Sequence, residues 1–183
     1  VQAGETLLVH GGSGGVGVAA IQLARAWGVT VFATAGTERG LTLVGEQGAH
    51  QVFDHTQAGY TDRIREATGG RGVDVVLEML ANVNLDADLG LLAPRGRIVA
   101  VGNRGRVEID ARQAMARDGA ILGMSLMNAA PHDLIRIHAA LEAALASGIA
   151  RPIVGRRFAL HEAPKAHEAV MAPGAYGKIV LIP

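Results

Sequence analysis

A glycine-rich turn between an apolar strand and an alanine-rich helix, within Leu7–Gly28, constrains the fold of this chain more than any other feature. Gly12, Gly14 and Gly17 form the pattern G-x-G-x-x-G directly after the apolar residues. The first glycine of this pattern permits a tight turn, the second lets the backbone approach a phosphate, and the third lets the helix pack closely. The unpaired amides at the start of the helix then face the two phosphate charges. The segment therefore predicts a dinucleotide pyrophosphate site.

Two alternatives compete with this interpretation. A purely structural strand-turn-helix unit stays open, because 25 of the 183 residues are glycine and glycine turns are common. A second apolar run, Val29–Ala35, follows at the spacing of a βαβ unit and favours the dinucleotide site. A Walker phosphate loop is excluded, because Val18 and Ala19 follow Gly17 where that loop needs lysine and a hydroxyl.

Composition limits the partners of this chain. Of its 183 residues 49% are hydrophobic, which is enough for one sizeable core. The 17 basic and 17 acidic residues balance, so we expect no nucleic acid and no membrane as a partner. There is no cysteine, no secretory leader and no apolar run near the roughly 20 residues of a membrane helix, so we expect a cytoplasmic protein. The chain starts so close to the turn that it is either a native start or the interior of a longer protein.

Apolar strands alternate with helical segments as far as Leu126, which is typical of a doubly wound parallel sheet with helices on both faces. We expect a six-stranded Rossmann sheet with strands at Thr6–His10, Thr30–Ala35, Gln51–Asp54, Val73–Glu78, Arg97–Val101 and Ala120–Ser125. We expect helices at Val16–Trp27, Arg39–Gln47, Tyr60–Thr68, Asn84–Leu92 and Ala111–Arg117. Since parallel strands end on one side of the sheet, the residues just after each strand are candidates for ligand contacts.

The pattern changes after Leu126. We expect a long helix at Pro131–Ser147 with a broad apolar face, an extended run at Pro152–Leu160, a short helix at Glu162–Met171 and a strand at Lys178–Ile182. Because the six-stranded sheet is already complete, we expect these last strands to pair with residues outside this chain. We therefore divide the chain into a Rossmann domain, residues 1–126, and a C-terminal segment, residues 127–183.

The end of the second predicted strand indicates which dinucleotide binds. A site for NAD carries Asp or Glu there, whereas this strand ends in Ala35 and Gly36. A 2′-phosphate would meet no negative charge and would have room, so the sequence favours NADPH. Arg39 and His55 are the nearest candidates to contact this phosphate. The alternatives are a solvated Arg39 and a His55 that is hydrogen-bonded to Asp54 in a turn.

The loops after the fourth, fifth and sixth strands are candidates to contact the ribose and the nicotinamide. They supply Asn84, then Val101, Gly102, Asn103 and Arg104, and finally Met124, Ser125 and Leu126. Four of these candidates have a structural alternative: Asn84 could cap a helix, Gly102 could serve a turn, and Met124 and Leu126 could pack at the sheet edge.

We predict no catalytic residue and no metal in this chain. Glu78 ends the fourth strand, but the pattern places no base or nucleophile beside it. The seven histidines are scattered, and we find no Ser-His-Asp order, no paired carboxylates and no metal-ligand cluster. The chemistry is therefore expected to come from the cofactor, by hydride transfer.

Five segments carry a resemblance to a known family: HGGSGGVG at His10–Gly17, TAGTE at Thr34–Glu38, GAH at Gly48–His50, EMLANVNL at Glu78–Leu85 and VGNRG at Val101–Gly105. They resemble the ζ-crystallin-like NADPH:quinone oxidoreductases, a branch of the medium-chain dehydrogenase/reductase superfamily. The resemblance implies that the pyrophosphate is cradled by Ser13, Gly14, Gly15 and Val16, and that Gly36 and His55 lie by the 2′-phosphate. It implies that Asn84, residues 101–104 and residues 124–126 approach the ribose and the nicotinamide.

The resemblance also implies a larger protein. Family members carry a GroES-like β-barrel domain before this region, which forms the other wall of the active-site cleft, and the C-terminal segment returns to that domain. The implied activity is zinc-free transfer of hydride or electrons from NADPH to a quinone or a similar conjugated carbonyl. Zinc ligands of alcohol dehydrogenase relatives would fall before Val1. This chain departs from the family in carrying Gly12 where the relatives tend to carry alanine.

Three functions stay open at this point: a quinone reductase, an enone or enoyl reductase or zinc alcohol dehydrogenase of the same superfamily, and a non-catalytic, crystallin-type role. Ile121–Leu126 is an apolar strand at the expected sheet edge, and the relatives resemble dimers or tetramers through this edge. We therefore expect a homodimer or tetramer. Without the preceding domain we expect no turnover.

Overall fold

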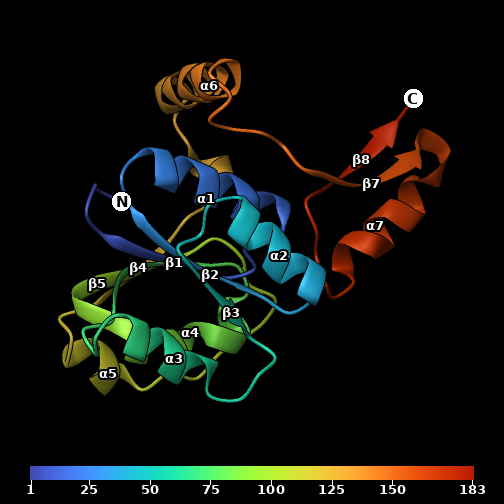
Figure 1. The fold of residues 1–183 in the computed structure, drawn as a ribbon. Coiled ribbons are helices and arrows are strands. Elements are labelled where there is room, and N and C mark those ends of the chain that lie inside the picture. The colour runs from blue at the N-terminus through green and yellow to red at the C-terminus, as the bar shows by residue number, and fades with distance from the viewer.

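The computed structural model describes residues 1–183 and contains the six-stranded, fully parallel sheet that the sequence predicts (Figure 1). The strand order is β3-β2-β1-β4-β5-β6. The strands are β1 (Thr6–Val9), β2 (Thr30–Ala35), β3 (Gln51–Asp54), β4 (Val73–Glu78), β5 (Leu92–Ala100) and β6 (Ala120–Gly123). The strand order reverses between β1 and β4, and ligands of such sheets bind at the carboxyl ends of the strands at this point.

Helices cover both faces of the sheet. They are α1 (Gly15–Ala26), α2 (Glu38–Glu46), α3 (Tyr60–Ala67), α4 (Ala81–Leu91) and α5 (Ala111–Met115). In Figure 1, α1 and α2 lie on one face, and α3, α4 and α5 lie on the other. Each face has its own apolar core, and β1 contributes to both: Leu7 and Val9 belong to the first core and Leu8 to the second. The end of β1 is therefore held between two packed layers.

Most elements lie within two residues of their predicted bounds, but two begin at least three residues earlier than predicted. Helix α4 begins at Ala81 rather than at Asn84, so Asn84 lies inside the helix and does not cap it. Strand β5 begins at Leu92 rather than at Arg97, because Leu92 is fully buried and pairs with Val73 of β4. Leu92 therefore belongs to the strand rather than to the end of the predicted helix.

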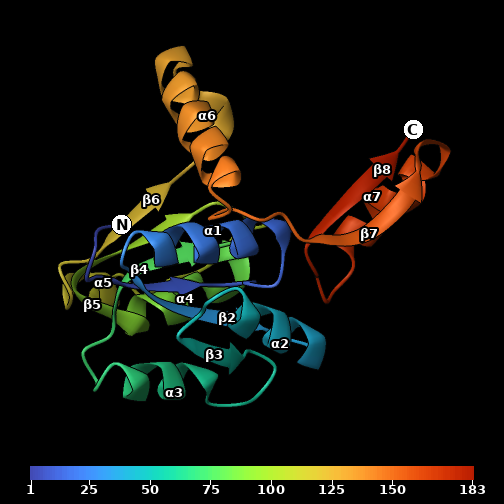
Figure 2. The ribbon, with the colours of Figure 1, turned by 45° about the horizontal axis from the view of Figure 1, so that its top comes forward.

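The C-terminal segment stands away from the sheet in two parts (Figure 2). It contains α6 (Pro131–Ala146), β7 (Val154–Ala159), α7 (Ala163–Met171) and β8 (Lys178–Ile182), with short 3₁₀ turns at Leu126–Asn128 and Leu160–Glu162. Strands β7 and β8 pair with each other in parallel, a pairing that the sequence did not predict. The expectation that they also pair with residues outside this chain stays a prediction. They can pair because α7 supplies the crossover connection that parallel strands need.

Much of the apolar surface at β6 and α6 is not covered by the rest of the chain. In α6 only Ala144 is buried, whereas Ile135 is 70% exposed. Every residue of β6 is exposed, and β6 forms an open edge of the sheet. No helix combines the length and the apolar character that crossing a membrane would require.

Candidate functional site

The glycine-rich loop joins β1 to α1 at the carboxyl edge of the sheet. Its left-handed residue is Gly11, with a φ of +61°, rather than Gly12 as the motif predicts. The Gly11 amide donates to Thr34 Oγ1 at 3.2 Å, and the Gly12 amide donates to the Thr34 carbonyl at 2.8 Å. A Cβ added to Gly12 would lie 3.0 Å from the Ala33 Cβ. The tight turn is therefore made at Gly11, while Gly12 packs against the core.

The next two glycines of the motif differ in their surroundings. A Cβ at Gly17 would lie 2.5 Å from the Gly11 carbonyl oxygen, so α1 packs on the loop only with glycine there, as predicted. A Cβ at Gly14 would meet nothing closer than 3.5 Å, so packing does not demand glycine at that position. No side chain caps α1 at Gly14, which leaves the first-turn amides, including those of Gly15 and Val16, without intrahelical acceptors. This helix end can therefore hold an anion.

Residues 174–178, which we call the strap, cross the glycine-rich loop. The Ser13 hydroxyl donates to the Ala175 carbonyl at 2.7 Å, and the Gly177 amide donates to the Ser13 carbonyl at 2.7 Å. Gly177 also forms an isolated parallel bridge with Gly14. The strap therefore engages the hydroxyl proton and the carbonyl group of Ser13, a predicted pyrophosphate contact, and the Ser13 amide remains to donate to a ligand.

Two cationic side chains lie beside the start of α1. Lys178 covers Gly15 so closely that an added Cβ would clash with its side chain. Arg39, a predicted 2′-phosphate contact, stacks on Tyr176 with 3.7 Å between the guanidinium carbon and the ring centroid. Both cations line one pocket together with Gly14, Gly15 and Val16. Sequence reasoning missed Lys178 because no local pattern links the final strand to the first helix.

The structure brings Gly36 and His55 together, as predicted. A Cβ on Gly36 would lie 2.5 Å from His55 Nε2. Both residues line a pocket at the carboxyl edge with Gly11, Ser13 and other loop residues. Burial lowers the pKa of His55, and the charge of His10 adds to this effect, so His55 is neutral at neutral pH.

Two neighbours of this pocket differ from expectation. Asp54 Oδ1 accepts from the Thr56 amide at 2.9 Å and from the Thr56 hydroxyl at 2.7 Å. The hydrogen bonds of the Asp54 carboxylate go to Thr56 and Gln57 and none goes to His55, so the alternative that Asp54 holds His55 in a turn is wrong. Arg104 was predicted to approach the ribose and nicotinamide, but it lines the pocket that contains His55, because its amide donates to Asn82 Oδ1 at 2.8 Å.

His10, Glu78 and Asp88 form a buried polar cluster that sequence reasoning missed. His10 Nε2 lies 2.8 Å from Asp88 Oδ1 and 3.7 Å from Glu78 Oε2. The ligand-type atoms of the three residues lie within 4.8 Å of one another, which corrects the statements that Glu78 lacks a basic partner and that no such cluster forms. Asp88 could not be placed beforehand because it comes from α4, whose orientation on the sheet is set by tertiary packing.

The pKa values of this cluster are shifted by burial and by mutual contact. Burial raises the pKa of Glu78 to about 7, and the neighbouring carboxyl group of Asp88 acts in the same direction. Burial alone would lower the pKa of His10, but the hydrogen bond to Asp88 and the charges of both carboxyl groups raise it. The Oδ2 atom of Asp88 is buried without a hydrogen-bond partner.

Other predicted ribose and nicotinamide contacts are bonded to the protein itself. Asn84 Nδ2 donates to both Glu78 carboxylate oxygens at 3.2 Å. The Val101 amide donates to the Glu78 carbonyl at 2.8 Å, and Asn103 Nδ2 donates to a nearby carbonyl at 2.7 Å. An added Cβ on Gly102 would clash with the backbone of the loop after β4. The glycine therefore permits the approach of two protein loops.

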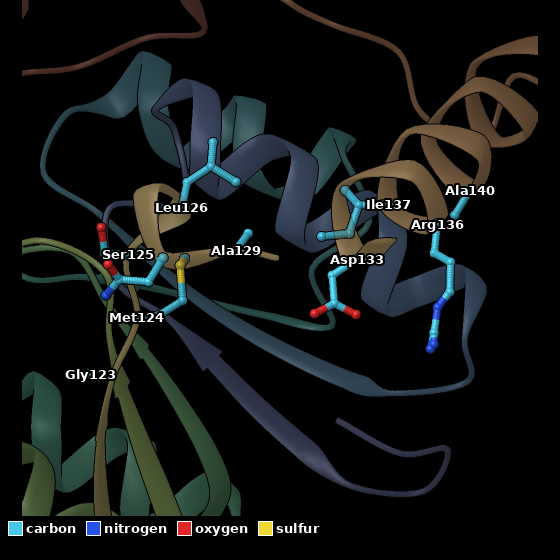
Figure 3. Close-up of a pocket in the computed structure, with 10 residues that line it drawn as sticks. Gly123, Met124, Ser125, Leu126, Ala129, Asp133, Arg136, Ile137 and Ala140 are labelled. Carbon is cyan, nitrogen blue, oxygen red and sulfur yellow. The ribbon is translucent and has the colours of Figure 1, made fainter. Parts of the chain in front are cut away.

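Met124, Ser125 and Leu126 line a separate pocket between the end of β6 and α6 (Figure 3). Met124 is 48% and Leu126 61% exposed, so nothing within this chain packs over them at the sheet edge. Asp133 and Arg136 of α6 line the same pocket. This pocket shares no residue with the two that contain the glycine-rich loop.

Comparison with known proteins identifies the relatives of this chain. The family model described as zinc-binding dehydrogenase matches residues 15–154. Human quinone oxidoreductase is 44% identical over all 183 residues, and the pig enzyme is 45% identical. This chain spans 56% of the length of each of these two relatives.

Solved structures agree with this comparison. A mycobacterial protein in complex with NADPH superposes with a TM-score of 0.91 at 32% identity, covering all of this chain and 58% of the other. The CurK enoyl reductase superposes with a TM-score of 0.87 at 28% identity, covering 99% of this chain and 55% of the other.

Proposed function

The chain belongs to the zinc-binding dehydrogenase family of the medium-chain dehydrogenase/reductase superfamily, and on this premise we propose that it is the NADPH-binding part of a zinc-independent quinone oxidoreductase. One observation supports this proposal above the others. The uncapped start of α1 and the pocket of Gly36 and His55 adjoin at the carboxyl edge of the sheet, with Ser13 between them. This is the arrangement that a dinucleotide with a 2′-phosphate requires.

The residues present fit NADPH. The pyrophosphate would lie on the first-turn amides of α1, where Lys178 adds positive charge. The 2′-phosphate would lie by Gly36 and His55, and Arg104 supplies a guanidinium to the same pocket. Strand β2 ends without the acidic residue that binds the ribose in NAD sites, so this phosphate meets no carboxylate at that position. When bound, the nicotinamide supplies the hydride, and the protein supplies position and electrostatics.

The residues of this chain do not fit the zinc ion that the family name implies. Catalytic zinc binds three protein ligands at about 2.0–2.3 Å and keeps one open position. This chain has no cysteine, and its one cluster of ligand-type atoms is the buried group of His10, Glu78 and Asp88. The 2.8 Å distance between His10 and Asp88 is that of a hydrogen bond, and the cluster leaves no open position. We therefore derive no step through zinc.

The proposal extends to the parts around this site. Residues 127–183 would belong with a GroES-like domain, because α6 exposes apolar residues that nothing in this chain covers. That domain and the pocket of Met124–Leu126 would enclose the quinone. The open edge of β6 would pair with a second copy of the protein in a homodimer or tetramer. With no cysteine and balanced charge, we place the protein in the cytoplasm.

Turnover tests the proposed function. NADPH and a quinone are added to this chain and to a chain extended upstream to the length of the curated relatives. We expect both chains to bind NADPH and only the extended chain to consume it, followed as loss of nicotinamide absorbance. Equal, substantial rates from the two chains would contradict the two-domain arrangement, and no consumption by the extended chain would contradict quinone reduction.

An enone or enoyl reductase is the second candidate, and the likeness to the CurK enoyl reductase favours it. The same cofactor site serves both reactions, because the fold does not determine the substrate. Replacing the quinone by a conjugated enone in the same assay separates the two. Faster consumption of NADPH with the enone would favour the second candidate.

A further inference from the structure

A series of buried side chains connects α4 to the glycine-rich loop. Asp88 Oδ1 lies 2.8 Å from His10 Nε2. On the other side of the imidazole ring, His10 Nδ1 lies 3.4 Å from Thr34 Oγ1. The same hydroxyl oxygen accepts the Gly11 amide at 3.2 Å. Asp88, His10 and Thr34 are each 3% exposed or less, so water does not compete for these contacts.

The contact to Gly11 leads to the start of α1. Gly11 is the left-handed residue of the loop, and its carbonyl oxygen accepts the Gly14 amide at 3.1 Å. Gly14 is the N-cap of α1, so its position determines where the unpaired amides of the first turn lie. The Gly12 amide is held by Thr34 as well, because it donates to the Thr34 carbonyl at 2.8 Å. The position of Thr34 therefore determines the path of the loop between β1 and α1.

The chemistry of these groups fixes the direction of the hydrogen bonds. The Gly11 amide only donates, so Thr34 Oγ1 is its acceptor. A carboxylate only accepts, so His10 Nε2 carries a hydrogen that it donates to Asp88. In a neutral His10 ring, Nδ1 then has a lone pair that accepts the Thr34 hydroxyl hydrogen. In a charged ring, Nδ1 donates to a second lone pair of Thr34 Oγ1 instead. Both charge states of His10 therefore keep the connection.

Stability alone does not account for Asp88. Its Oδ2 atom is buried without a hydrogen-bond partner. Leu85 and Leu89 of the same helix belong to the apolar core that α4 forms with the sheet. An unpaired acceptor and a carboxyl group inside an apolar layer both lower the stability of the fold. The presence of Asp88 is explained by its other oxygen atom, which orients the ring of His10.

We propose that Asp88, His10 and Thr34 are positioning residues for the nucleotide. Asp88 orients the ring of His10, and this ring orients the Thr34 hydroxyl group. The hydroxyl group holds Gly11, so that the first-turn amides of α1 face the pyrophosphate. None of the three side chains needs to touch the ligand. They act on the part that NADPH and NADH share, whereas His55 acts on the 2′-phosphate alone. Only the identity of the ligand rests on the proposed function.

The first experiment needs no ligand. Backbone order parameters are measured by NMR relaxation for Gly11 and for Leu8, which lies buried in the middle of β1. We expect Thr34→Val, which keeps the branched shape without the hydroxyl group, to lower the order parameter of Gly11 and to leave that of Leu8 unchanged. Thr34→Ser keeps the hydroxyl group and should behave as the wild type. Thr30→Val, at the start of the same strand, is the matched control. An unchanged Gly11 in Thr34→Val, or an equal fall at Leu8, would overturn the proposal.

The second experiment tests the part that Asp88 plays. NMR of the ring nitrogens of His10 in the wild type should show a hydrogen on Nε2, and its absence would overturn the proposal whether or not any variant folds. Asp88→Leu has a similar branched shape without an acceptor, so it should lower the order parameter of Gly11 as Thr34→Val does. The double variant should lower it no further, because the connection is already broken. Additive losses, or no loss in Asp88→Leu, would contradict the connection through His10.

The third experiment separates this proposal from the proposed function. NADPH and NADH are titrated with the wild type, Thr34→Val and Asp88→Leu. We expect each variant to bind both dinucleotides about two- to tenfold more weakly, as for one lost hydrogen bond, with the preference between them unchanged. If Gly11 responds as expected but the wild type binds neither dinucleotide, the proposed function is wrong and the connection from Asp88 to the loop is retained. If the wild type binds both and the variants bind them equally well, the positioning role is wrong.

Discussion

At the scale of single residues, Gly17 is needed for packing of α1 on the loop, whereas Gly14 is needed for the approach of the ligand. Gly17→Ala brings a Cβ to 2.5 Å from the Gly11 carbonyl oxygen, so we expect the free energy of unfolding to fall by about 1–3 kcal/mol. Gly14→Ala has room, with nothing within 3.5 Å, and should change stability little while weakening NADPH binding. Urea unfolding and NADPH titration of both variants check this. Equal loss of stability in the two would contradict the packing argument.

Glu78 should make stability depend on pH. Its folded pKa of about 7 lies above its ordinary value of 4.5, so the folded state binds this proton more tightly than the unfolded state. The contribution is complete at low pH and is lost as the pH rises from about 4.5 to about 7, an effect of up to about 3 kcal/mol. The raised pKa of His10 acts in the same direction above its ordinary value. Urea unfolding across this range should show that the free energy of unfolding of the wild type falls as the pH rises. The free energy of unfolding of Glu78→Gln should stay nearly constant up to the ordinary pKa of His10.

The sequence could predict contacts that depend on strand ends but not those that depend on helix orientation. Gly36 and His55 follow neighbouring parallel strands, so their meeting was foreseeable. Asp88 and Lys178 could not be placed, because each comes from a distant element whose position tertiary packing decides. Asn84 was predicted to contact a ligand or to cap a helix, but its side chain donates to the buried Glu78 carboxylate. The sequence around Asn84 does not indicate that Glu78 lies within hydrogen-bonding distance.

At the scale of elements, α6 should be less protected than the helices that cover the sheet. Only Ala144 of α6 is buried, whereas α1 and α4 bury several residues each. Local opening costs less where few apolar contacts are lost. Hydrogen exchange followed by mass spectrometry should show faster exchange in residues 131–146 than in α1. Comparable protection in the isolated chain would contradict the exposed placement of α6.

Strands of the main sheet were predictable because each is an apolar run bounded by polar or glycine residues. Strands β7 and β8 were recognised as extended segments, but their mutual pairing was missed. Each strand has exposed and half-buried residues without a clear apolar face, so the hydrophobic pattern alone does not indicate which strand it pairs with. The crossover through α7 is what brings them together.

At the scale of the whole molecule, the open edge of β6 should join two copies. Ile121 and Leu122 are 40% and 48% exposed on this edge, and an unpaired strand is a template for another strand. We expect the wild type to sediment as a dimer or tetramer. Ile121→Lys should shift it to monomer, because a charge at an edge strand opposes pairing. A monomeric wild type, or a variant that stays associated, would contradict this arrangement.

The most direct test of the account is the affinity of this chain for NADPH relative to NADH, measured by titration at neutral pH. We predict tighter binding of NADPH, and a loss of about tenfold or more of that preference in His55→Ala, as for a hydrogen bond to a charged group. Arg39→Ala should weaken both dinucleotides alike, because Arg39 lies beside the start of α1 with Lys178 and outside the pocket of Gly36 and His55. Tighter binding of NADH, or no binding of either dinucleotide, would contradict the account.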